Sequence, residues 1–371
     1  STDERREKMN YTFIVLAGMI TIFFVAEYIG KIINPDSSMS AGIIAAGLEL
    51  VLGSFPSILD EIVGLLPFTL TGKPLDNEVN KWSLIAGIVL IIVGIYIWQY
   101  VRDRFYVLNL FGLYSQREIS EKKNIKDLKL NDFKIRERII DFVNVFKMGV
   151  DEQKNKIIIN KISDECNKFK ERSKEFDIGF TGTAPIPYTI LAGTYLVDCD
   201  IKKYFEWNRE QECFKSLLNT KKKKYNSLII KEPDNKNRDL KSVIVAISTT
   251  KRVQMEQLRD FENQDVIEIY LENCRDNNIR YISQLYEYRK TVLDKLEKIG
   301  TDYPKLEQIN LVASIPSCLS VEIGRMVAQN NNRVKKIVSY HFERQSEKLY
   351  PFGIVITESR GQYEKGAFVE N

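Results

Sequence analysis

The sequence contains a stretch of twenty residues, 82–101, that carries no formal charge. At about 1.5 Å per residue, a helix of this length covers the roughly 30 Å hydrocarbon core of a bilayer. Trp82, Trp98 and Tyr100 lie near its ends, and amphipathic rings favour the headgroup region. The stretch therefore predicts a transmembrane helix in the N-terminal third of the chain.

A second apolar segment precedes this one at about residues 11–33 and predicts another span. Between the two spans, residues 40–66 form short apolar helical stretches that are interrupted by charge and are too short to cross a bilayer. We expect amphipathic helices there that are interfacial, re-entrant or pore-lining. Lys and Arg residues gather before the first span and after the second, which places both termini in the cytoplasm.

Two glycines in the second predicted span, Gly87 and Gly94, are seven residues apart and so share one helix face. Small residues allow close helix packing in lipid. The pattern favours a packed face there, although glycine is also common background in membrane helices.

From about residue 115 the composition changes, because Lys, Glu, Asp, Asn and Arg become dense. Residues 120–176 show apolar positions at helical spacing. Short β-branched runs at 227–231, 242–248, 309–313 and 353–357 alternate with helical segments farther on. Runs of this kind are typical of strands covered on both faces, as in an α/β layered sheet.

This pattern divides the chain into three parts. We predict an α-helical membrane hairpin over residues 1–112, a helical connector over 113–149, and an α/β domain over 150–371.

Several common chemistries lack their residues. The five cysteines contain no C-x-x-C spacing, and His341 is the only histidine, so zinc sites and Ser-His-Asp hydrolysis lose most candidates. We expect a packing or hydrogen-bonding role for His341. No phosphate-binding P-loop or dinucleotide fingerprint is present. A net charge of +4, from 54 basic and 50 acidic residues, does not by itself indicate a polyanionic partner.

One short pattern occurs twice. Thr183-Ala-Pro185 is followed by Gly193, and Ser314-Ile-Pro316 is followed by Gly324, so that both copies read [ST]-x-P-x7-G. A strand-to-helix turn of this kind presents backbone N–H groups at a helix N-terminus, where phosphates bind well. Chance or shared helix-start chemistry explains the match equally well.

At these positions the chain resembles the SAVED domain. The resemblance rests on FTGTAPIPYTILAG at 180–193, YFEW at 204–207, VIVAIS at 243–248, the segment 313–324, and YHF at 340–342. It covers about residue 150 to the C-terminus. It implies an α/β domain of two fused CARF-like Rossmannoid halves that senses cyclic oligonucleotides in bacterial CBASS antiphage signalling. Two membrane spans fused to SAVED are a known effector arrangement.

The resemblance also implies a set of ligand-binding residues. The turn residues are Thr181, Gly182, Thr183 and Pro185, with the second-half counterparts Ser314, Ile315 and Ser317. The candidates for stacking a base are Tyr188, Tyr204 and Trp207, and the candidates for phosphate contact are Thr249, Thr250 and Lys251. Each aromatic residue, taken singly, is as readily a core residue.

The resulting hypothesis is an antiphage effector at the bacterial inner membrane. Binding of a cyclic tri- or tetranucleotide, made by a partner nucleotidyltransferase, would drive head-to-tail homo-oligomerisation and disruption of the lipid bilayer. We expect no catalytic residue, no metal, no other cofactor, and no DNA or RNA polymer as partner. Two alternatives stay open: a membrane-tethered phosphodiesterase that degrades the ligand (a ring nuclease), and a non-catalytic membrane scaffold.

Overall fold

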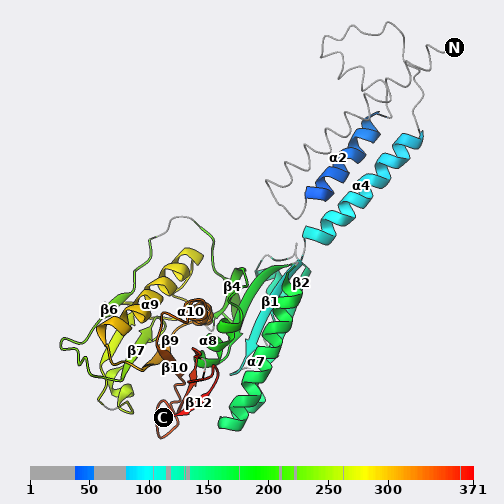
Figure 1. Cartoon of the computed structure of the whole chain (residues 1–371). Coiled ribbons are helices and arrows are strands. Elements are labelled where there is room, and N and C mark those ends of the chain that lie inside the picture. The colour runs from blue at the N-terminus through cyan, green and yellow to red at the C-terminus, as the bar shows by residue number, and fades with distance from the viewer. Residues whose placement is uncertain are drawn as a thin grey trace, which may run out of the picture. The chain divides into compact units, whose positions relative to one another are not determined.

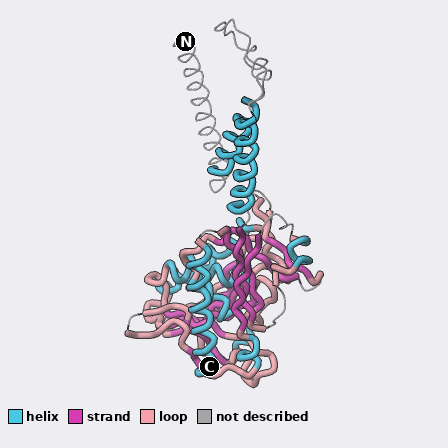
Figure 2. Tube along the Cα trace, turned by 90° about the vertical axis from the view of Figure 1, so that its right-hand side faces the viewer, coloured by secondary structure: helices cyan, strands magenta, loops and turns pink. Residues whose placement is uncertain are grey.

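The chain forms two compact units, Ser1–Arg104 and Phe105–Asn371. The computed structural model describes residues 38–53, 81–102, 104–113, 118–128, 130, 134–174, 176–208, 211–220, 224–261, 263–359 and 361–371. In unit 1 the described elements are helices, whereas unit 2 combines helices and strands (Figure 2).

Unit 1 contains the helices α2 (Ser38–Gly53) and α4 (Lys81–Arg102). They pack closely through Gly47 and Gly87, because a Cβ on either glycine would come within 2.8 Å of the other's carbonyl oxygen. Gly87 and Gly94 are both buried, so the predicted glycine face of α4 is a packed face. The other faces of α4 expose apolar side chains, including Ile92 at 60% and Ile85 at 53%.

The prediction of membrane spans receives no support from the structure. Across the described part of the chain, no helix combines the length and the apolar character that a bilayer crossing requires. The predicted span 82–101 corresponds to α4, and residues 40–53 lie in α2. The predicted span 11–33 and residues 57–66 lie outside the described residues.

Unit 2 has an α/β architecture, as predicted. Its described residues form a five-stranded sheet in the order β2-β1-β3-β4-β5 and a seven-stranded sheet in the order β12-β11-β10-β9-β7-β8-β6. The first sheet comprises β1 (Arg104–Phe111), β2 (Lys134–Asp141), β3 (Asp177–Thr183), β4 (Ile201–Asn208) and β5 (Cys213–Ser216). The second comprises β6 (Ile229–Lys231), β7 (Ser242–Ser248), β8 (Val266–Tyr270), β9 (Gln308–Ser314), β10 (Lys336–Tyr340), β11 (Phe352–Val355) and β12 (Phe368–Glu370).

Both sheets are mixed, with parallel strands at their centres. In the first sheet β3 pairs in parallel with β1 and β4. In the second, β7 pairs in parallel with β8 and β9, and β9 with β10. The four apolar runs predicted as strands form β6, β7, β9 and β11. The exception to their predicted burial is β6, whose residues are exposed.

Helices cover the sheets and fill the space between them (Figure 1). The long helices are α7 (Glu152–Ser173), α8 (Ile186–Tyr195), α9 (Ile282–Asp302) and α10 (Ser317–Gln329), with short α5 (Lys122–Asp127), α6 (Val143–Lys147) and the 3-10 turn η2 (Met255–Leu258). Asp151 begins α7 by accepting a hydrogen bond from Lys154 N at 2.8 Å. Tyr106 of β1 stacks on Phe169 of α7 with ring centroids 4.6 Å apart, so α7 packs on the first sheet.

The segment before residue 150 differs from the prediction. Residues 105–112, assigned to the membrane region, contain most of β1, which is buried within the first sheet. The expected helical connector 113–149 contains strand β2. Glu137 of β2 accepts hydrogen bonds from Asn109 of β1 at 2.6 Å and from Ser120 N at 3.0 Å. Short apolar patterns do not distinguish helix from strand, and these long-range pairings favour the strand.

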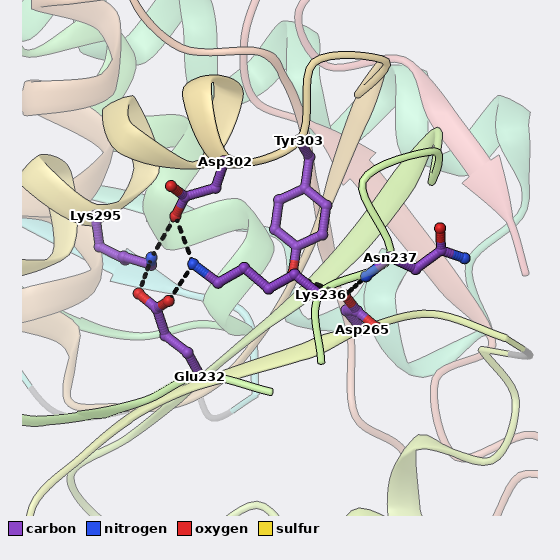
Figure 3. Close-up of polar contacts among 7 residues, drawn as sticks. All are labelled: Glu232, Lys236, Asn237, Asp265, Lys295, Asp302 and Tyr303. Carbon is purple, nitrogen blue, oxygen red and sulfur yellow. Dashed lines mark hydrogen bonds and ion pairs between the residues drawn. The ribbon is translucent and has the colours of Figure 1, made fainter. Parts of the chain in front are cut away.

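A charged group in unit 2, here called the Lys295 cluster, consists of Glu232, Lys236, Lys295 and Asp302 (Figure 3). The Lys295 side chain is only 3% exposed and pairs with both carboxylates. Lys236 pairs with the same two carboxylates. The cluster joins the β6–β7 loop to helix α9. Each of its four charged groups has a partner of opposite charge.

Candidate functional site

The two copies of the [ST]-x-P-x7-G pattern are equivalent strand-turn-helix units. The first is β3 followed by α8, and the second is β9 followed by α10. Helices α8 and α10 lie side by side (Figure 1) and meet at Gly193 and Gly324. A Cβ on Gly193 would lie 2.2 Å from Val321 O, and one on Gly324 would lie 1.9 Å from Ile190 O. The glycine of each copy therefore allows the close approach that brings the two turns together.

Both turns line one cavity of ≈ 380 Å³ in unit 2. Its walls come from the carboxyl ends of β3 and β9, together with residues at or after the ends of β4, β7 and β10. Open α/β sheets bind ligands at this edge, and the volume lies within the range of small-molecule sites. The cavity is therefore the candidate binding site.

Most of the predicted site residues reach this cavity. The lining includes Gly182, Thr183, Pro185, Trp207, Thr250, Lys251, Ser314, Ile315 and Ser317. The loop after β7 joins the second turn through hydrogen bonds: Thr250 Oγ1 lies 2.9 Å from Ser314 Oγ, and Lys251 N donates to Ser314 Oγ at 3.2 Å. Lys251 forms no ion pair with any residue that the structure describes, so its ammonium group is available to an anion.

Two of the three predicted stacking rings are core residues. Tyr188 is fully buried, and its hydroxyl donates to Asn155 Oδ1 at 3.0 Å. The Tyr204 side chain is also fully buried, and its hydroxyl donates to Glu322. Burial raises the pKa of both hydroxyls. Neither ring lines the cavity, because each satisfies its hydroxyl inside the core.

Thr181 and Thr249 also lie outside the lining. Thr181 is a buried residue within β3, paired with Asn109 of β1. Thr249 is fully buried, and its hydroxyl finds no hydrogen-bond partner among the described residues. In each of these two loops the residues that line the cavity therefore begin one position after the predicted start, at Gly182 and at Thr250.

The structure adds cavity residues that sequence reasoning missed. The charged and polar ones include Glu206, Arg252, Gln257, Asp276 and Asn277, and the aromatic ones include Tyr340, Phe342 and Tyr350. Arg252 pairs with Glu268 of β8 and is thereby partly neutralised. One signal for Glu206 was present in the sequence, since it is a lone carboxylate between the aromatic residues Phe205 and Trp207.

Glu206 holds the N-terminus of α10. Its Oε1 accepts hydrogen bonds from Ser317 Oγ at 2.9 Å and from Cys318 N at 2.6 Å. Burial raises the pKa of Glu206 above its usual range, and the hydrogen bonds from Cys318 and Ser317 act in the opposite direction. In contrast, no side chain in the described part of the chain accepts a hydrogen bond from the first turn of α8.

His341 also lines the cavity, directly after β10. Its ring packs edge-to-face on Phe146, with centroids 5.3 Å apart, and beside Phe352 at 5.2 Å. Burial lowers the pKa of His341 to about 4, so the imidazole is neutral at pH 7. The expected packing role agrees with these ring contacts, and the ring adds an uncharged face to the cavity.

The described residues contain no group of His, Cys, Asp and Glu side chains arranged to hold a metal ion. All five cysteines are free. Burial raises the pKa of Cys318, next to Glu206, well above its usual value. The chemistry of the cavity is therefore that of hydrogen-bond donors, the two carboxylates of Glu206 and Asp276, one free ammonium group and aromatic faces.

Comparison with solved structures finds the Cap4 SAVED/CARF-domain containing receptor of Acinetobacter baumannii. With the cyclic trinucleotide 2′3′3′-cAAA, that structure is 12% identical, with a TM-score of 0.48, and the match covers 88% of this chain and 67% of that one. With 3′3′3′-cAAA the identity is 10%, the TM-score is 0.44, and the match covers 78% and 55% of the two chains. The chain thus spans about two thirds or less of the receptor's length.

Comparison with curated proteins finds no match. The family comparison is positive: the SAVED model, described as the SMODS-associated and fused to various effectors sensor domain, matches residues 162–356. This segment is more than half of the chain and contains both strand-turn-helix units and every residue that lines their cavity except Leu113. The chain therefore belongs to the SAVED family.

Proposed function

We propose that unit 2 is a receptor for a cyclic tri- or tetranucleotide in a CBASS-type antiphage system. The cavity supports this most directly, because it combines an open helix N-terminus at α8, the free ammonium group of Lys251 and the ring of Trp207. These groups suit phosphate binding and base stacking respectively. Membership of a sensor-domain family, and the cyclic trinucleotides named with the Cap4 receptor structures, support the same class of ligand.

Calorimetric titration of the full chain with cyclic di-, tri- and tetranucleotides tests this proposal. We expect binding of at least one ring, and about a 10-fold weaker affinity after Lys251→Ala, because one charge-assisted contact is lost. The matched control is Lys290→Ala, an exposed lysine of α9 outside the cavity, which should not change the affinity. Absence of binding to every ring would overturn the proposal.

Binding without turnover is the favoured activity. A general base works best with a pKa near the working pH, and the pKa of His341 is about 4, so the imidazole is a weak base. We therefore expect a cyclic ligand to be recovered intact after long incubation. Linear products in the chromatogram would instead establish the ring-nuclease alternative.

We further propose that unit 1 provides the output by disrupting the bacterial inner membrane after ligand-driven assembly of copies of the chain. The supporting observation is the apolar surface of α4, where Ile88, Val89 and Tyr96 are 45%, 52% and 69% exposed. Surfaces of this kind mark contact with protein or lipid. Both termini are then cytoplasmic.

Dye release from liposomes that contain the full chain tests the output. We expect release only when the ligand is added, and less release after Ile88→Ser together with Ile92→Ser. Confirmed ligand binding without release would favour the scaffold alternative.

A further inference from the structure

The two strand-turn-helix units differ in charge although they agree in backbone form. In the first unit, the N-terminus of α8 lies at the cavity, and no described side chain accepts a hydrogen bond from its first turn. In the second unit, the carboxylate of Glu206 already holds the N-terminus of α10. A helix N-terminus attracts anions, and at α10 the Glu206 carboxylate already occupies this position. The two ends of the cavity therefore suit opposite ligand groups.

Glu206 keeps one oxygen for the cavity. Oε1 accepts both hydrogen bonds that hold the α10 turn, those from Ser317 Oγ and Cys318 N. Oε2 accepts neither of them, and the Cys318 thiol also lies next to this carboxylate. Glu206 itself lines the cavity. An ionised carboxylate only accepts hydrogen bonds. Burial raises the pKa of Glu206, and a donor group of the ligand at Oε2 would favour the ionised form against this effect. The ionised Oε2 then meets a donor on the ligand rather than a phosphate or a carbonyl group.

We infer that Glu206 selects a ligand whose base carries an exocyclic amino group, with a ligand phosphate at the α8 end. This inference rests on the proposed function. Adenine, cytosine and guanine have such an amino group, and uracil has none. The amino group donates to Glu206 Oε2, while Oε1 keeps the α10 turn in place. The ligand consequently binds in one orientation despite the repeated backbone.

The deciding variant is Glu206→Gln. Its amide oxygen can keep the two hydrogen bonds from Ser317 and Cys318, and the amide nitrogen then replaces Oε2 as a donor. The turn at α10 is thus retained while the cavity-facing group changes from acceptor to donor. The matched control is Glu287→Gln on α9. The exposed Glu287 carboxylate accepts a hydrogen bond from Ser227 Oγ at 3.2 Å and does not line the cavity.

The experiment titrates the full-length wild type and both variants with cyclic tri- and tetranucleotides carrying adenine, cytosine, guanine or uracil. The tightest ring is then compared with an analogue that lacks the exocyclic amino group. For the wild type and Glu287→Gln we expect removal of the amino group to weaken binding about 10- to 100-fold, as for a hydrogen bond to a charged acceptor. For Glu206→Gln the two rings should differ less than about 3-fold, with the unfolding temperature unchanged.

Each result is decisive. An all-uracil ring as the tightest ligand, or full discrimination by Glu206→Gln, would overturn the inference and leave the proposed function intact. Equal affinities of the wild type for the tightest ring and for its analogue without the amino group would also overturn the inference and leave the proposed function intact. Failure of the wild type to bind any ring would overturn both.

Discussion

Unit 2 contains two polar regions that differ in how their groups are paired. In the Lys295 cluster, two lysines share two carboxylates, and the Lys295 side chain is 3% exposed. In the cavity, Lys251 forms no ion pair with a described residue, and Glu206 Oε2 accepts neither of the two hydrogen bonds from the α10 turn. Buried charges are tolerated when paired, whereas free polar groups in a concave site serve a ligand. The cluster is thus a structural feature, and the cavity is the candidate binding site.

The substitution expected to have the largest effect on the cavity, without affecting the Lys295 cluster, is Gly324→Ala. Its Cβ would lie 1.9 Å from Ile190 O, a backbone atom, so α8 and α10 must move apart. We expect a loss of about 3 kcal/mol in the free energy of unfolding and loss of ligand binding, with the Lys295 cluster intact. Urea titration and ligand titration measure the two effects.

The control for this substitution is Gly300→Ala in α9. A Cβ there would come only within 3.4 Å of the Lys335 side chain, which is ordinary contact. We expect a gain of up to about 1 kcal/mol from helix propensity and unchanged binding. If both alanines behave alike, the close approach of α8 and α10 does not build the cavity.

Lys295→Ala tests the paired region. It removes a buried ammonium group from between Glu232 and Asp302. Because Glu232 is partly exposed and Lys236 still pairs with both carboxylates, we expect a loss of about 2 to 3 kcal/mol, near the lower end for a buried pair. Affinity for the ligand, measured below the unfolding temperature, should stay the same. A selective loss of affinity would show that the cluster contributes to the site.

The smallest effect concerns His341. Burial lowers its pKa to about 4, while in the unfolded chain it titrates near 6.5. The unfolded state therefore binds a proton first as the pH falls, and stability is lost below about pH 6.5. Between pH 7.5 and 5.5 we expect a loss of about 1 kcal/mol that is absent in His341→Gln. Because His341 is the only histidine, its ring resonances in a pH titration give the pKa directly, and a value near 6.5 would contradict the burial.

Much of the fold was accessible from the sequence. The runs at 242–248 and 309–313 lie in the buried strands β7 and β9, because β-branched residues covered on both faces leave a local pattern. The segment at 134–141 was assigned to a helix and forms β2. Its pairing depends on β1 and Asn109, which lie outside any local window.

The site divides in the same way. Pro185, Ser314 and Ser317 line the cavity, and neighbouring residues encode the strand-to-helix turns that carry them. Tyr188 and Tyr204 do not line it, and nothing local indicates whether a ring faces a cavity or finds a buried partner for its hydroxyl. The partner of Tyr204 is Glu322, 118 residues away.

The sequence by itself determined the α/β layers and the repeated turn, with a glycine at the same position in each copy. Only the tertiary structure decided that these glycines pack against each other and that both turns line one cavity. It also decided that Glu206, 111 residues from Ser317, holds the turn before α10, whereas no described side chain caps the N-terminus of α8. Turn geometry depends on adjacent residues, whereas the charge at each helix end depends on which distant strand packs against it.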